Sequence, residues 1–348
     1  MEFALKRFKE RVSFIERQIK TQRLTHELVP SRLQTDLSDD DSSKLSVILS
    51  NTTDEKIYQY TANVITLYGG LECFVEEVVE EYLKEVFSIC PSYKQLRGQF
   101  GLSEYLLFGI SLINHAGERK FKRLSKTDVL KSLFETVVND KSSSVRSEAY
   151  IDYGGGNYRH ETIMNCFIQL GMKDIKTCLK LYEPLSSYIK KKGIGDSDTV
   201  YIKIDDLVER RNELAHGGNT IEVLDSGVFS EYLSFLSLYT ETINNFIKSF
   251  INQHKWNMSN DDIIDPRVYS GNIVVLKDDD VGLGFFLKKG QPVLILRDSK
   301  YYDGVICNIQ VEGVDYSEYK KEAEGIEIGL KILSECIITK ECKFKIIS

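Results

Sequence analysis

Residues 204–217 read Ile-Asp-Asp-Leu-Val-Glu-Arg-Arg-Asn-Glu-Leu-Ala-His-Gly and predict a helix that ends at the glycine pair beginning with Gly217. At about 100° per residue, one face of this helix is an apolar stripe made of Ile204, Leu207, Val208 and Ala215. Arg211 falls near the middle of that stripe, and Asn212 and His216 fall along one edge. Because a buried charge is costly unless it is paired or used, this polar trio is the main candidate for a functional site.

A structural interpretation of the same trio is open as well. In that interpretation Arg211 pairs with a carboxylate in the core, and His216 stabilises the C-terminal end of the helix, where a cation is favoured. Arg210, one residue before Arg211, points the other way and is placed to form an ion pair with Asp206 one turn earlier. Whether Arg211 also has a carboxylate partner therefore separates the two interpretations.

The trio has the chemistry that RNA cleavage requires. Histidine titrates near neutral pH and serves as a general base or acid. An arginine beside it holds a phosphate and stabilises the charge that develops on the phosphate oxygens. Asn212 can orient the imidazole ring or hold a substrate oxygen. This combination suits attack by an RNA 2′-hydroxyl on its own 3′-phosphate, which leaves a 2′,3′-cyclic phosphate and a 5′-hydroxyl.

This reaction calls for no metal, and the sequence offers no convincing set of metal ligands and no cofactor motif. It does benefit from both a base and an acid, whereas one helix supplies a single histidine. We therefore expect two copies of the helix to pack across a two-fold axis and to supply two histidines and two arginines.

The longest helical pattern covers residues 54–89 and carries one more candidate. Gly69 and Gly70 lie inside it at a cost of about 1 kcal/mol each relative to alanine, which predicts close packing of another helix there. Glu72 lies at the edge of the apolar stripe. It either extends into solvent or orients Arg211 or His216 from behind.

Four basic residues gather between two shorter helical patterns: Arg119, Lys120, Lys122 and Arg123. A loop of this charge density is a candidate contact for RNA phosphates, and it is equally typical of an ordinary surface loop. The net charge is -7, so no overall field favours nucleic acid. RNA binding would have to rely on such a local basic surface.

The hydrophobic period changes from 3.6 to 2 near residues 257–265. The segment before this change has the periodicity of helices, and the segment after it has short alternating runs separated by turn signals. We expect a mainly α helical bundle over residues 1–256, a linker over 257–265 and a small all-β barrel over 266–348.

The composition is that of an ordinary globular protein, with 348 residues of which 42% are hydrophobic and 28% charged. Seven cysteines are scattered without zinc spacing, which indicates reduced residues of the core. The N-terminal stretch is too charged for a signal peptide, and no apolar run reaches the length that spans a membrane. These features favour a cytoplasmic protein.

Two stretches resemble a known family. Arg-Asn-Glu-Leu-Ala-His-Gly, residues 211–217, resembles the R-x4-6-H signature of the HEPN superfamily in its R-N-x-x-x-H form. Asn-Tyr-Arg-His-Glu-Thr-Ile, residues 157–163, together with Leu170-Gly171-Met172, resembles the segment before this motif in RiboL-PSP-type HEPN-like nucleases. The resemblance covers residues 1–255.

The resemblance implies a metal-independent endoribonuclease that acts as a dimer, with Arg211, Asn212 and His216 in the motif roles. It also implies a place in toxin–antitoxin or antiviral defence, where an antitoxin or another regulatory partner would be expected. The alternative is a non-catalytic module that binds RNA or regulates a partner protein. An open, basic surface around Arg211 and His216 would favour the enzyme, and a sealed pair with a buried carboxylate, such as Glu72, would favour the module.

The C-terminal segment has a second resemblance. Residues 303–311 and 325–330 resemble the β-barrel domain 2 of translational GTPases. This resemblance implies tRNA or the ribosome as a target, or else a barrel that binds a protein partner.

Overall fold

The computed structural model describes residues 2–32, 52–152, 157–194, 198–216, 223–277 and 280–347. Contacts between residues divide the chain into a helical unit, residues 1–245, and a strand unit, residues 246–348. The predicted helix stop at Gly217 lies outside the described residues. The expected order, helices first and an antiparallel sheet second, is confirmed.

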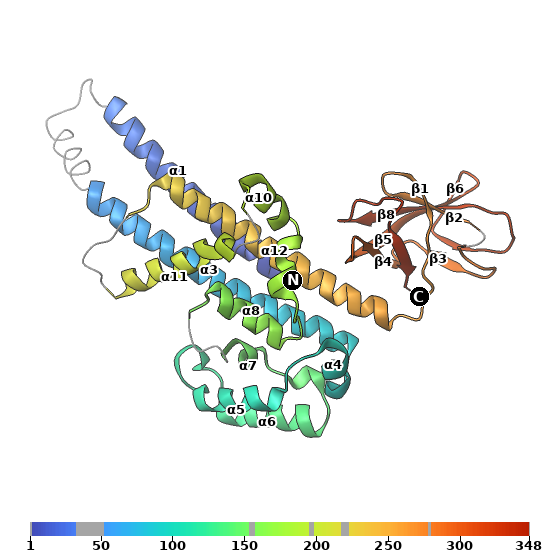
Figure 1. Ribbon diagram of the computed structural model, residues 1–348, viewed down its shortest axis with the longest axis horizontal. Helices are drawn as coiled ribbons and strands as arrows, with labels where there is room; N and C mark the ends of the chain where they lie inside the picture. Colours follow the sequence, from blue (N-terminus) through green and yellow to red (C-terminus); the bar gives the residue numbers. More distant parts are fainter. Residues whose placement is uncertain are drawn as a thin grey trace. The chain divides into compact units, whose positions relative to one another are not determined.

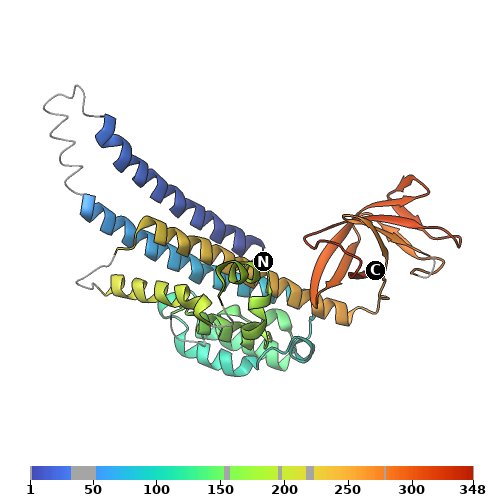
Figure 2. The same ribbon diagram turned by 45° about the horizontal axis from the view of Figure 1, so that its top comes forward.

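Long helices form the frame of the helical unit. They are α1 (Glu2–Arg32), α3 (Thr52–Ile89) and α12 (Ser226–Met258), which run side by side (Figures 1 and 2). Their facing sides hold large buried side chains, including Phe8, Leu71, Val75 and Phe235. Burial of this apolar surface is the main stabilising contribution, at about 25 cal/mol per Å².

The glycine pair in α3 lies against α1. A Cβ atom on Gly70 would lie 3.2 Å from Cδ of Arg11 and 3.5 Å from the ring of Phe8. The Arg11 guanidinium also donates a hydrogen bond to the Gly69 carbonyl at 3.1 Å. The predicted close packing of another helix at this pair is therefore confirmed.

Shorter helices complete the helical unit. They are α4 (Tyr93–Phe100), α5 (Tyr105–His115), η1 (Arg119–Phe121), α6 (Lys126–Leu133), η2 (Phe134–Val138), η3 (Ser142–Ser144), α7 (Ser147–Asp152), α8 (His160–Gln169), α9 (Ile175–Cys178), η4 (Leu179–Leu181), α10 (Leu185–Lys192), η5 (Asp198–Tyr201) and α11 (Ile202–Ala215). The turn after α8 lies directly on the end of α4: Gly171 has φ +99°, and a Cβ atom there would lie 1.8 Å from the Phe100 carbonyl oxygen. Only glycine fits this contact without a shift of the backbone.

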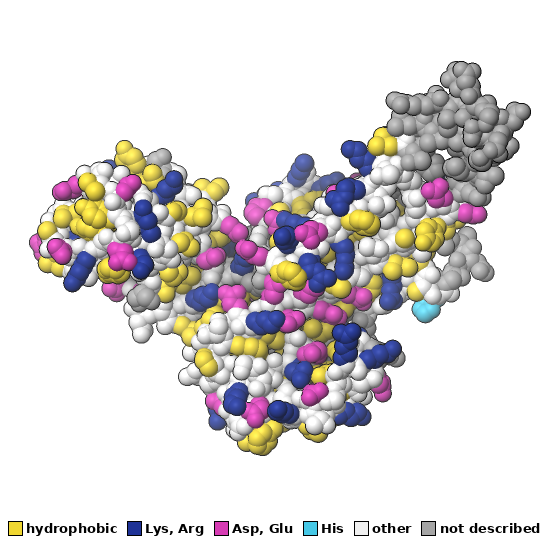
Figure 3. Space-filling model, turned by 180° about the vertical axis from the view of Figure 1, so that it is seen from behind, with side chains coloured by type: hydrophobic (Ala, Val, Ile, Leu, Met, Phe, Trp, Pro, Cys, Tyr) yellow, Lys and Arg dark blue, Asp and Glu magenta, His cyan; other side chains and the backbone are white. Residues whose placement is uncertain are grey.

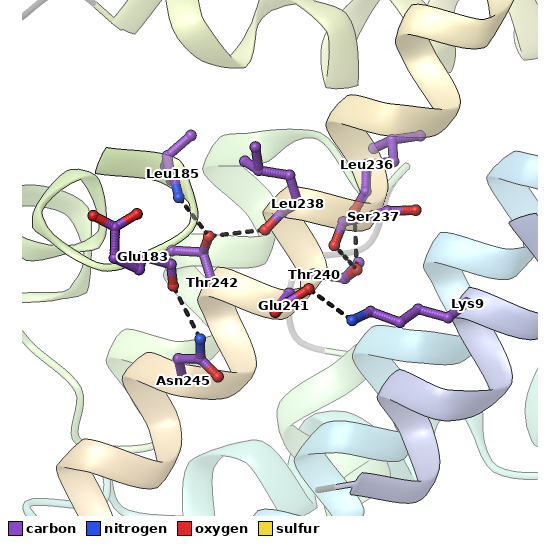
Figure 4. Close-up of polar contacts among 10 residues, drawn as sticks. All are labelled: Lys9, Glu183, Leu185, Leu236, Ser237, Leu238, Thr240, Glu241, Thr242 and Asn245. Carbon is purple, nitrogen blue, oxygen red and sulfur yellow. Dashed lines mark hydrogen bonds and ion pairs between the residues drawn. The ribbon is translucent and has the colours of Figure 1, made fainter. Parts of the chain in front are cut away.

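The middle of α12 is buried and yet polar, and its hydroxyl groups are satisfied locally (Figure 4). The Thr242 hydroxyl donates to the Leu238 carbonyl at 2.8 Å and accepts the N–H of Leu185 at 3.2 Å. On the side that faces α1, Glu241 forms an ion pair with Lys9 at 2.6 Å. These contacts attach the start of α10 and the first turns of α1 to the same segment of α12.

The strand unit is a curled antiparallel sheet with the strand order β1-β2-β8-β5-β4-β9, in which β6 also pairs with β5; β3 and β7 form a separate pair. Its strands are β1 (Arg267–Ser270), β2 (Ile273–Leu276), β3 (Phe286–Lys288), β4 (Pro292–Arg297), β5 (Lys300–Val311), β6 (Val314–Tyr316), β7 (Glu318–Lys320), β8 (Ile328–Ser334) and β9 (Lys343–Ile346). Buried Ile, Val and Leu side chains fill the concave side. Ile264, just before β1, forms a bridge with Phe344 of β9, so the sheet is a half-barrel whose two edges meet at one point.

The last turns of α12 belong to the strand unit. The N–H of Tyr301 donates to the Ser249 hydroxyl at 2.9 Å, and Asn252 donates to Asp303 at 3.4 Å. The buried ammonium group of Lys345 donates to the carbonyls of Trp256 and Ser259 at 3.0 and 2.8 Å. These bonds explain why the contacts divide the chain within α12 rather than after it.

Candidate functional site

The helix predicted over residues 204–216 is α11, which packs on α3 (Figure 1). Ile204, Leu207 and Val208 are buried, as the helical periodicity predicts. Ala215 is exposed, so its predicted place in the apolar stripe is wrong. The stripe is buried in the first part of α11, whereas the last turn reaches solvent.

The two adjacent arginines of α11 have different surroundings, as predicted. Arg210 forms an ion pair with Asp206 at 2.7 Å and donates to the Tyr60 hydroxyl at 3.3 Å. The Tyr232 hydroxyl donates to the same Asp206 carboxylate at 2.5 Å. Arg210 is therefore a structural cation that connects α11 with α3 and α12.

Arg211 is half-buried and lies against an aromatic ring rather than a carboxylate. Its guanidinium carbon is 5.0 Å from the centre of the Tyr68 ring on α3, which is a cation–π contact. One of its nitrogens, Nη1, donates to Oδ1 of Asn212 at 3.1 Å. Within the described part of the chain, Arg211 forms no ion pair with an acidic residue. The core carboxylate that the structural interpretation requires is not found there.

Asn212 is joined to a second asparagine from a distant part of the sequence. Nδ2 of Asn157 donates to Oδ1 of Asn212 at 3.2 Å. The Tyr68 hydroxyl donates to Oδ1 of Asn157 at 3.5 Å and accepts the N–H of Tyr158 at 3.1 Å. Tyr68, Asn157, Arg211 and Asn212 thus form a closed ring of contacts, which we call the Arg211 network.

His216 follows the last residue of α11. Its backbone N–H donates to the Asn212 carbonyl at 3.0 Å, so the position of His216 is tied to the same turn as Asn212. Its side chain is exposed, and no polar partner of the ring occurs among the described residues. The ring is therefore accessible to solvent.

Glu72 lies one turn after Tyr68 on α3 and is half-buried. Burial raises the pKa of Tyr68 to about 12, and the Glu72 carboxylate acts in the same direction. In the described residues we find no hydrogen bond or ion pair from Glu72 to Arg211 or His216. Its influence on the site therefore passes through Tyr68.

The basic residues of the α5–α6 connection have different environments. Lys120 lies 3.5 Å from both the Glu76 carboxylate and the Tyr158 hydroxyl, and it also contacts the Tyr158 ring. Lys122 and Arg123 are exposed, and the side chain of Arg119 lies outside the described part. Tyr158 follows Asn157, so the structure brings Lys120 next to the Arg211 network.

On the face of the helical unit that Figure 3 shows, Lys and Arg side chains are interspersed with Asp and Glu side chains and do not gather into a basic patch. No group of three or more His, Cys, Asp or Glu side chains in the described residues is arranged to hold a metal ion. None of the described helices combines the length and the apolar character that a bilayer span requires.

Helical periodicity in the sequence does not identify Tyr68 or Asn157 as residues of the site. Tyr68 has an ordinary place in the apolar stripe of α3, and only the structure shows its ring beneath Arg211. Asn157 lies in residues 157–163, and the resemblance of this stretch to a family segment is the one feature of the sequence that points to it.

That stretch runs along α11 and contacts it at three successive turns. Asn157 bonds to Asn212, Arg159 forms an ion pair with Glu209, and the N–H of His160 donates to Asp205 at 3.0 Å.

Comparison with known proteins identifies one family. The family model for RiboL-PSP-HEPN matches residues 8–249, which include α11 and the segment that runs along it. No curated protein and no solved structure gives a significant match. Because the family model covers more than half of the sequence, the chain belongs to the RiboL-PSP-HEPN family.

Proposed function

We propose that this protein is an endoribonuclease in which Arg211, Asn212 and His216 act on RNA without a metal. The observation that carries the proposal is the state of Arg211. Its guanidinium is half-buried on the Tyr68 ring and held by Asn212, yet it has no acidic partner in the described residues. A fixed and partly desolvated cation of this kind is suited to an anionic phosphate.

The proposed reaction uses the nucleophile that RNA itself carries. A base removes the proton from a 2′-hydroxyl, whose oxygen attacks the adjacent phosphorus. The bond from phosphorus to the 5′-oxygen of the next nucleotide breaks, and that oxygen takes a proton from an acid. Arg211 stabilises the charge on the non-bridging oxygens, and His216 transfers protons. The products carry a 2′,3′-cyclic phosphate and a 5′-hydroxyl.

The acid and the base in this scheme are two copies of His216. A homodimer with the exposed ends of two α11 helices facing each other would supply both, because one α11 has a single histidine at its end. The two copies of Arg211 would then face one phosphodiester from two sides. In this arrangement the RNA lies between the subunits, and Lys120, Lys122 and Arg123, with Arg119, are the proposed contacts for its flanking phosphates.

A role as a toxin or an antiviral defence effector in the cytoplasm is part of the proposal, and so is control by an antitoxin or another regulatory partner. The resemblance of the strand unit to domain 2 of translational GTPases supports tRNA or the ribosome as the target. That resemblance stays a prediction.

A second candidate function is a HEPN module that binds RNA or regulates a partner protein without cutting. The charge distribution favours it, since the net charge is -7 and Lys120 already has Glu76 as a partner. In the described residues the Arg211 network contains no carboxylate that would neutralise the guanidinium, and this favours the enzyme.

Substitution of Arg211 by alanine tests the proposal. Purified wild-type protein should cleave total RNA in excess EDTA, and Arg211→Ala should be slower by about 10²- to 10³-fold, the cost of losing one group that stabilises developing charge. Lys191→Ala, which removes an exposed cation at the end of α10, is the matched control and should cleave at the wild-type rate. Equal rates for all three proteins would contradict the role of Arg211.

A further inference from the structure

Within the proposed nuclease, we infer that Asn157 and Tyr68 are positioning residues that fix the Asn212 amide so that its Nδ2 donates to a phosphate oxygen of the RNA. Neither residue belongs to the R-N-x-x-x-H motif. Both reach it from other elements: Tyr68 from α3, and Asn157 from the segment before α8. The inference rests on the proposed function and adds to it a direction for the Asn212 side chain and two residues that impose this direction.

The hydrogen bonds to Asn212 determine which way its amide faces. Its Oδ1 accepts from Arg211 at 3.1 Å and from Asn157 at 3.2 Å. Because two N–H donors meet at this oxygen, only one orientation of the Asn212 amide fits. The flipped amide would place its NH₂ group against both donors. The Nδ2 group is thereby left as the available donor. Asn212 therefore acts on the substrate as a hydrogen-bond donor and not as a base.

Asn157 can donate to Asn212 only if its own amide is held in the matching orientation, and Tyr68 supplies this constraint. The Tyr68 hydroxyl, which also has the Glu72 carboxylate as an acceptor, donates to Oδ1 of Asn157 at 3.5 Å, and this contact leaves Nδ2 of Asn157 for Asn212. Burial raises the pKa of Tyr68 to about 12, so the hydroxyl keeps its proton at neutral pH and remains a donor. The same residue carries Arg211 on its ring. Tyr68 thus sets the positions of both motif residues.

The segment that carries Asn157 is anchored independently of this network. The N–H of His160 bonds to Asp205, and Nδ1 of His160 lies 3.0 Å from the Tyr239 hydroxyl. The His160 ring also stacks on the Tyr201 ring with centres 3.5 Å apart and planes 9° apart. Because α8 begins at His160, this stack fixes the segment to η5, α11 and α12. Asn157 is therefore held from outside the site, as a positioning residue requires.

This arrangement predicts a specific kinetic effect. Loss of the Asn157 bond leaves the Asn212 amide held by Arg211 without its second donor, so the amide is less firmly fixed and can rotate. RNA binding depends on many phosphate contacts, whereas the chemical step depends on this one orientation. The value of kcat should therefore fall while KM changes little, because small errors of placement cost about 10²-fold in well-oriented reactions.

The test uses the full-length protein and a fluorescent single-stranded oligoribonucleotide of mixed sequence, in EDTA. Asn157→Ala and the isosteric Asn157→Asp, which cannot donate, should each lower kcat about 10- to 100-fold with KM within about twofold of wild type. Tyr68→Phe keeps the ring and removes the hydroxyl, and it should give a smaller loss of the same kind. Asn114→Ala, exposed on α5, is the matched control and should behave as wild type. Thermal midpoints show whether each variant is folded.

A double substitution separates positioning from general damage. If Asn157 acts through Asn212, then Asn157→Ala should cost almost nothing in a protein that already carries Asn212→Ala. An active wild type with fully active Asn157 variants, or additive losses in the double variant, would overturn the inference and leave the proposed function standing. A wild-type protein that leaves RNA intact would instead overturn the proposed function, and this inference with it.

Discussion

Replacing His216 with alanine is expected to slow RNA cleavage by about 10³-fold or more, since general acid–base catalysis contributes about 10²- to 10⁴-fold and the proposed dimer would lose both copies of the histidine. The side chain is exposed and makes no polar contact within the described residues, so its removal should not change the stability of the fold. The initial rate of oligoribonucleotide cleavage is the quantity to measure.

The control for this variant lies on the same helix. Glu213→Ala removes an exposed side chain from α11 three residues before His216, and its cleavage rate should stay within about twofold of wild type, as is usual for surface substitutions. A His216→Ala protein that cleaves as fast as Glu213→Ala would exclude His216 from the reaction. The wild-type and variant proteins should share one thermal midpoint.

The largest effect on stability is expected at Gly171. A Cβ atom there would lie 1.8 Å from the Phe100 carbonyl oxygen, and φ is +99°, where an L-residue is strained. The backbone of α4 or of the turn would have to move in order to relieve the contact. Gly171→Ala should therefore cost about 4 kcal/mol or more of the free energy of unfolding, in the range of the most damaging single substitutions.

Gly98→Ala is the matched comparison, because it adds the same methyl group to nearby α4. A Cβ atom at Gly98 meets nothing within 4 Å, and alanine favours a helix over glycine by about 1 kcal/mol. Thermal unfolding followed by circular dichroism should show Gly98→Ala at or above the wild-type midpoint. Gly171→Ala should unfold about 10 °C lower or fail to accumulate as soluble protein. Equal midpoints for the two variants would show that the Gly171 contact is not tight.

Local periodicity was sufficient for the features that depend on one element. Helical periodicity correctly placed Arg210 and Arg211 on different faces of α11. The ion pair of Arg210 with Asp206 could be predicted because it needs only the geometry of one helix. The glycine pair in α3 predicted a close helix neighbour because a helix interior has few other reasons to contain glycine. The change of period likewise predicted the order of helices and strands.

The features that depend on two distant segments could not be predicted in the same way. Tyr68 and Asn157 are 89 positions apart and meet only in the folded chain. Periodicity also placed Ala215 in the buried stripe. It shows which face of α11 a residue occupies, but not how far the neighbouring helix extends along that face. Periodicity placed Arg211 on the apolar face of α11, but its aromatic partner, the Tyr68 ring, is brought there only by the tertiary structure.

The chemistry of the product ends tests the central claim most directly. A defined single-stranded RNA, incubated with the wild-type protein in EDTA and examined by mass spectrometry, should yield fragments with 2′,3′-cyclic phosphate and 5′-hydroxyl ends. The same RNA with a 2′-O-methyl group at the cleaved position should stay intact, because its nucleophile is blocked. Cleavage of the methylated RNA, or fragments with 3′-hydroxyl and 5′-phosphate ends, would contradict the assignment of Arg211, Asn212 and His216 as a site for attack by the 2′-hydroxyl.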